Sequence, residues 1–226
     1  MSALAPTASL RHPLPKALLV LTFTTGIVDA VSFLGLGRVF TANMTGNVVL
    51  LGFGIAGSAG LPIAAPFASL GAYVLGAIAG GRVARRVAPE RLLATALAIE
   101  VGLLAVTAVL AATASVTPGT AAAYVLIILL AFTMGLRSAC IRRLGASDIS
   151  TVVLTMLLVD LASESPFAGG SGLGTLRRTS AVILMGAGAL AGALLLRVDV
   201  ALPLAIAAAL ALVTREAYRA SSTISP

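Results

Sequence analysis

Charged residues are scarce in this chain. They make up 10% of its 226 residues, where a soluble domain carries about 25%. Hydrophobic residues make up 59%, and the mean hydropathy is +1.08. A chain of this composition is solvated by lipid. We therefore expect an integral membrane protein whose main partner is the lipid bilayer, with little left over for a soluble domain.

The residues that many enzymes and metal sites need are also scarce. Cys140 is the single cysteine, which excludes internal disulfides and cysteine-based metal clusters. His12 is the single histidine and lies in the N-terminal tail, so an intramembrane hydrolase would lack the usual base. The sequence shows no nucleophile–base pair, metal-ligand cluster or phosphate-cradling loop. We expect no enzyme activity, no metal and no cofactor.

Long apolar runs dominate what remains. A spanning helix needs about 20 apolar residues. Six runs qualify, at 17–37, 63–84, 92–114, 121–141, 180–196 and 199–214. The first run is too long for a signal peptide, and no clear Ala-x-Ala site precedes a polar mature region. We interpret residues 17–215 as one transmembrane domain between tails at 1–16 and 216–226.

The chain has a net charge of +7, and its basic residues are distributed according to membrane side. This distribution argues against nucleic acid as a partner. If residues 17–60 make one net crossing, the basic residues at the ends of the spans fall on one side, with the exceptions of Arg38 and Arg197. The loop 115–120 on the other side carries no charge. Positively charged loops stay in the cytoplasm, so we expect both tails to be cytoplasmic.

Two stretches of the sequence repeat each other. The pattern Phe-Thr-x-Gly-x3-Ala begins at Phe23 and again at Phe132, and in each copy threonines stand six and ten residues after a Leu-Gly pair. About ten identities fall in roughly thirty positions, where chance gives about three. Each copy is followed by Gly-x3-Gly, at Gly76 and Gly188, a pattern that packs helices closely in lipid. We interpret 17–114 and 121–215 as homologous halves.

Each half has a broken first unit and two spanning helices, which gives three net crossings. Because three is odd, the second half enters the membrane in the opposite orientation. The sequence thus predicts an all-α membrane protein, with six transmembrane helices in a 3+3 inverted repeat and two re-entrant or broken half-helices at 38–60 and 146–162. Unpaired backbone groups are costly in hydrocarbon, so each half-helix should fold against the bundle, and we expect the two to meet near its middle.

Asp29 lies about thirteen residues into the first span, where an acidic residue costs about 2.5–3.5 kcal/mol to insert. It could bind a proton, a cation or a substrate, or it could form a polar contact between helices. Arg137, next to the repeat equivalent Ser138, could pair with Asp29, and snorkelling to the membrane interface is its simpler alternative. For Glu100, a hydrogen bond to a neighbouring helix is favoured over a proton pathway.

The two polar breaks supply the other candidate residues. The run Thr41-Ala-Asn43-Met-Thr45-Gly-Asn47 is typical of a helix start rich in capping residues. Its N–H groups could receive an anion or a polar solute, its oxygens could coordinate a cation, and ordinary capping is the structural alternative. The full set of candidate substrate-binding residues is Asp29, Thr41, Asn43, Thr45, Asn47, Arg137, Ser138, Thr151 and Thr155.

Both breaks and their flanks resemble the YoaK family of bacterial inner-membrane proteins. The likeness is carried by Gly26-Ile-Val-Asp-Ala30 with Val39-Phe-Thr-Ala-Asn-Met-Thr-Gly-Asn47, and by Gly135-Leu-Arg-Ser-Ala139 with Ser150-Thr-Val-Val-Leu-Thr155. It covers about residues 17–215. The resemblance implies a multi-pass protein of the bacterial inner membrane and no particular substrate. The chain departs from the family pattern at Arg137 and Ser138, where Gln and Asn are common.

We therefore expect a transporter or permease for an unknown small solute or ion, with Asp29 as its coupling or gating acid. The alternative is a non-transporting membrane scaffold or partner-binding subunit, in which the polar breaks only lock helices together. A polar cavity reaching both half-helix starts would favour transport, and a dry, packed centre would favour the scaffold. The sequence leaves open whether the chain forms a homo-oligomer.

Overall fold

The computed structural model describes residues 13–58, 60–145, 154–172 and 174–222, and this part of the chain is built from helices. The first span is α1 (Pro13–Ala30) continued by the π-helical turn η1 (Val31–Gly37). The other spans are α3 (Ala64–Arg86), α4 (Pro89–Thr113), α5 (Ala121–Arg143), α7 (Thr175–Leu195) and α8 (Ala201–Ser222). In the described residues, six helices are long and apolar enough to cross a membrane, which confirms the prediction of an all-α membrane protein with six spans.

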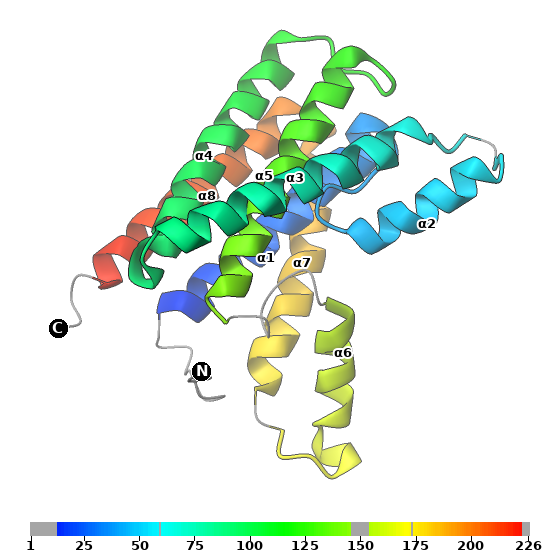
Figure 1. Ribbon diagram of the computed structural model, residues 1–226. Coiled ribbons are helices and arrows are strands. Elements are labelled where there is room, and N and C mark those ends of the chain that lie inside the picture. The colour runs from blue at the N-terminus through cyan, green and yellow to red at the C-terminus, as the bar shows by residue number, and fades with distance from the viewer. Residues whose placement is uncertain (1–12, 59, 146–153, 173, 223–226) are drawn as a thin grey trace.

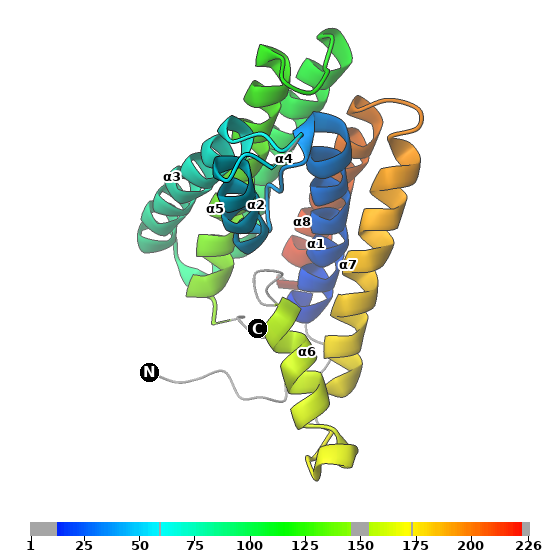
Figure 2. The ribbon, with the colours of Figure 1, turned by 90° about the vertical axis from the view of Figure 1, so that its right-hand side faces the viewer.

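Two further helices are too short to cross. α2 (Met44–Ile55) and α6 (Leu154–Ser163) have 12 and 10 residues. At 1.5 Å per residue they reach about 18 and 15 Å, roughly half of a hydrocarbon core of about 30 Å. Both begin near the middle of the bundle and run to opposite ends of it (Figures 1 and 2). α2 lies within the predicted half-helix segment 38–60, and α6 lies within 146–162 except for its last residue, Ser163. A short 3₁₀ turn, η4 (Pro166–Ala168), follows α6.

Successive spans alternate in direction (Figure 1). The start of α1, the α3–α4 link, the start of α7 and the end of α8 lie at one end of the bundle, which we call the terminal end. The opposite end is called the distal end. Basic residues gather at the terminal end, as the sequence predicts for one net crossing over 17–60. Arg38 and Arg197 follow η1 and α7 at the distal end.

The first helix of each half packs mainly against the other half. α1 lies against α7 and α8, and α5 lies against α3 and α4; Figure 2 shows α1 between α7 and α8. α4 and α8, the last helices of the two halves, also pack together. α1 and α5 are consequently the most enclosed spans, with 72% and 61% of their most apolar windows buried. The same contact pattern thus holds for both halves.

Glycines bring the paired helices into backbone contact. A Cβ on Gly188 of α7 would overlap the Phe23 carbonyl of α1. In the other half, a Cβ on Gly76 of α3 would overlap the Phe132 carbonyl of α5. The packing role predicted for the Gly-x3-Gly patterns is therefore confirmed, and the contacts are made by equivalent residues of the two repeats.

The helix ends differ from the prediction at both tails. α1 begins at Pro13 and α8 runs to Ser222, so helix extends into both segments that the sequence assigned to tails. The sequence-based prediction ended the last span at residue 214, where the apolar run ends. α8 continues past this point through a polar turn in which Glu216 forms ion pairs with Arg215 and Arg219.

Candidate functional site

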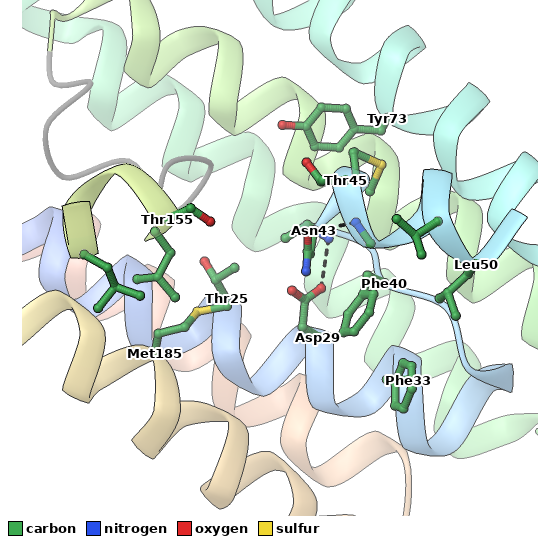
Figure 3. Close-up of a pocket in the computed structure, with 16 residues that line it drawn as sticks. Thr25, Asp29, Phe33, Phe40, Asn43, Thr45, Leu50, Tyr73, Thr155 and Met185 are labelled. Carbon is green, nitrogen blue, oxygen red and sulfur yellow. Dashed lines mark hydrogen bonds between the residues drawn. The ribbon is translucent and has the colours of Figure 1, made fainter. Parts of the chain in front are cut away.

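A cavity of about 660 Å³ lies where the two short helices begin (Figure 3). The starts of α2 and α6 line it together with α1, α3 and α7. Its polar lining consists of Thr25, Asp29, Asn43, Thr45 and Thr155, with the Tyr73 hydroxyl. Four of these residues, Asp29, Asn43, Thr45 and Thr155, are sequence-predicted candidates. The predicted meeting of the two half-helices near the centre is therefore found, at least for their described residues.

Asp29 fixes the loop that leads into α2. It is 5% exposed, and its Oδ1 accepts hydrogen bonds from the N–H groups of Thr41 (3.1 Å) and Ala42 (2.9 Å). The Thr41 hydroxyl donates to Ser32 Oγ at 3.5 Å, and the Ser32 hydroxyl donates to the Asp29 carbonyl at 3.1 Å. These bonds satisfy loop backbone that would otherwise be unpaired in apolar surroundings. Asp29 thus makes a polar contact with the loop before α2 rather than the predicted contact with another helix, and it also borders the cavity.

Asn47, a residue of α2, also binds the backbone of this loop. Its Oδ1 accepts from the Phe40 N–H at 2.9 Å, and its Nδ2 donates to the Phe40 carbonyl at 2.6 Å. The Ser69 hydroxyl of α3 donates to that carbonyl as well, at 2.7 Å. Asn47 is fully buried and is not among the described residues that line the cavity. Its position is that of a structural clamp, whereas Asn43 caps α2 by accepting from the Gly46 N–H at 3.2 Å.

Replacing the fully buried Asn47 with alanine is expected to destabilise the protein by about 1–3 kcal/mol, because the partly buried Phe40 N–H loses its acceptor. Thermal unfolding of the detergent-solubilised protein measures the effect. Asn43→Ala is the matched control on the same helix: it removes an exposed cap worth about 1 kcal/mol. Equal losses in the two variants would contradict the clamp.

Arg137 lies inside the bundle. It is 3% exposed, and its Nη1 lies 2.7 Å from Oε1 of Glu100, which is fully buried. The same guanidinium donates to the hydroxyls of Thr24 and Thr25 on α1. Both predicted roles of Arg137 are therefore wrong: it does not snorkel, and its ion pair is with Glu100 rather than Asp29. The reason is that α5 packs against α4, which brings a carboxylate to the guanidinium within the bundle. The hydrogen bond predicted for Glu100 is confirmed.

Three other candidates take no part in the described lining of the cavity. Thr41 is buried in the loop, where its backbone and hydroxyl are bonded as above. Ser138 is partly exposed on α5. Thr151 lies outside the described residues.

Aromatic residues around the cavity were not predicted from the sequence. Phe33, Phe40 and Tyr73 line it, three of only ten Phe and Tyr residues in the chain. Phe33 and Phe40 stack, with ring centroids 4.8 Å apart and planes at 22°. Aromatic residues are few in the chain, and three of the seven phenylalanines, Phe33, Phe40 and Phe53, fall within the first polar break or its flank. This concentration is the signal that could have drawn attention to them.

A second cavity, of about 560 Å³, lies at the distal end. Arg38, Tyr124 and the links at 60–62 and 118–119 contribute to its lining. Phe33 lines this cavity as well as the first one. Phe33, stacked on Phe40, is thus part of the wall between the two cavities.

Comparison with known proteins agrees with this architecture. The chain is 36% identical over 149 residues to the UPF0700 transmembrane protein YoaK of Bacillus subtilis (strain 168), and the match covers 64% of each chain. No solved structure matches. A family described as "Protein of unknown function (DUF1275)" matches residues 17–215, a range that takes in both short helices and the cavity between them. This chain therefore belongs to the DUF1275 family of transmembrane proteins of unknown function.

Proposed function

We propose that this protein is a transporter or permease for a small solute in the bacterial inner membrane. One observation carries the proposal: the starts of α2 and α6, which enter the bundle from opposite ends, line a single polar cavity. In many transporters, half-helix ends near the bilayer midplane bind the substrate or its coupling ion. A scaffold needs no such cavity. The lining offers hydroxyls, an amide and a carboxylate, which suit solute binding, and we propose no enzymatic role.

The packing supports an inverted repeat. α1 and α5 run in opposite directions, as do α3 and α7 (Figure 1). Equivalent glycines make equivalent contacts, Gly188 with Phe23 and Gly76 with Phe132. A pseudo-two-fold axis in the membrane plane would relate these pairs. Two inverted halves can exchange conformations around a shared site, which is the basis of alternating access.

The charge distribution supports an orientation with both termini in the cytoplasm. Basic residues gather at the terminal end of the bundle, and positively charged loops remain cytoplasmic. In this orientation the second cavity faces the periplasm. Phe33, which lines both cavities and stacks on Phe40, then lies on the periplasmic side of the central cavity.

Cysteine labelling tests the proposal without knowledge of the solute. In a Cys140→Ala background, Thr45→Cys and Thr155→Cys each place one thiol in the cavity, from α2 and α6. A membrane-impermeant maleimide is applied to right-side-out and inside-out vesicles. We expect each thiol to be labelled from both sides, at different rates, because the cavity opens alternately.

Thr107→Cys is the control, since Thr107 is fully buried on α4 and should stay unlabelled. Labelling of the two cavity thiols from one side only, or from neither, would contradict transport and favour the scaffold.

A further inference from the structure

We propose that the central cavity takes a small organic cation, an ammonium group carried on an apolar body. The inference rests on the proposed function, because it treats the cavity as the solute site, and it names the class of solute. It follows from the charge balance around the cavity and from the side chains that surround its one carboxylate.

Three charged side chains are buried among the described residues: Asp29, Glu100 and Arg137. The salt bridge makes Glu100 and Arg137 a neutral pair. Asp29 is left as the one charged side chain in the described lining of the cavity. The ion pair that Arg137 forms with Glu100 therefore leaves a negative charge at the cavity wall.

Backbone groups compensate only part of that charge. The N–H groups of Thr41 and Ala42 donate to Asp29 Oδ1. Each supplies a dipole rather than a full counter-charge. A carboxylate in low-dielectric surroundings is stabilised most by a cation in contact with it. Figure 3 shows the Asp29 carboxylate directed from α1 toward Asn43 and the start of α2, on the cavity side.

An anionic solute is disfavoured at the same place. No positive side chain is among the described residues that line the cavity. Thr25, which does line it, accepts a hydrogen bond from Arg137. The Arg137 guanidinium behind it is already bonded to Glu100, Thr24 and Thr25. An anion would therefore meet Asp29 without gaining Arg137.

The rest of the lining suits a cation with an apolar body. Phe33, Phe40 and Tyr73 surround the cavity, and the faces of aromatic rings attract cations. In Figure 3 the Phe40 ring lies beside Asp29, and Tyr73 lies across the cavity from it. Leu50 and Leu158 add aliphatic surface. A volume of about 660 Å³ falls within the range of small-molecule sites.

Three probes of matched shape test the charge preference: benzylammonium, benzyl alcohol and benzoate, each titrated calorimetrically at neutral pH into the purified, detergent-solubilised protein. We expect benzylammonium to bind about tenfold or more tightly than the other two. Asp29→Asn keeps an oxygen for the Thr41 and Ala42 N–H groups and removes the charge. It should weaken benzylammonium binding about tenfold and leave benzyl alcohol binding unchanged.

A second variant, Phe40→Leu, retains Asp29 and an apolar side chain of similar bulk. It should weaken benzylammonium binding severalfold through loss of the ring face, and it keeps the proposal testable if Asp29→Asn fails to fold. Preference for benzoate, equal binding of the three probes, or binding of none of them would overturn the cation proposal. Binding of benzylammonium with no uptake of it into proteoliposomes would leave the ligand class intact and overturn transport instead.

Discussion

Replacing Arg137 with methionine is expected to destabilise the protein by about 3–5 kcal/mol, since it leaves Glu100 buried without its counter-ion. Glu100 already has one carboxylate oxygen, Oε2, with no hydrogen-bond partner among the described residues. The variant would remove the partner of Oε1 as well. Thermal unfolding of the solubilised protein, followed by intrinsic tyrosine fluorescence or circular dichroism, measures the loss.

Two further variants separate charge from packing. Arg137→Met combined with Glu100→Gln removes both charges, and we expect it to be more stable than Arg137→Met alone because no unpaired charge remains. Arg142→Met, at an exposed site near the end of the same helix, should be close to neutral. Arg137→Met with the stability of Arg142→Met would show that the buried ion pair is dispensable.

Gly188→Ala is expected to cost about 1–3 kcal/mol or more, because the new methyl group would overlap the Phe23 carbonyl of α1 and neither backbone can yield easily. The equivalent change in the other half, Gly76→Ala, should have a similar cost at the α3–α5 contact. Size-exclusion chromatography and thermal unfolding in detergent measure both variants.

Gly186→Ala provides the control within the same helix. No atom lies within 4 Å of a Cβ built on Gly186, so this change should be neutral, or stabilising by up to about 1 kcal/mol through helix propensity. If Gly186→Ala and Gly188→Ala behaved alike, the close approach of α1 and α7 would be ruled out.

Local patterns in the sequence predicted the spans and the start of α2. Hydropathy placed the third span at 92–114 and the fourth at 121–141, and the helices are Pro89–Thr113 and Ala121–Arg143. Lipid solvation makes such segments recognisable, because each must be apolar over its whole length. The run from Thr41 to Asn47 likewise predicted a helix start by its capping residues. The structure places the start of α2 within this run, with Asn43 as the cap.

Contacts between distant residues could not be predicted in this way. Arg137 and Glu100 are 37 residues apart, and the sequence of α4 or of α5 alone does not indicate which faces of the two helices will pack together. For the same reason the sequence could not tell that Asn47 points away from the cavity and Thr45 toward it. The Gly-x3-Gly patterns marked faces for close packing and left the identity of the facing helix open.

The crossed packing of the halves has a consequence for how the protein is made. α1 is the first described helix to leave the ribosome, and its main neighbours, α7 and α8, are the last. The buried threonines and Asp29 of α1 therefore enter the membrane before α7 and α8, which later enclose them, have been synthesised. A nascent chain interrupted after α5 would hold an assembled α3–α5 pair, and α1 would have its contacts with α4 and α5 but not those with α7 and α8.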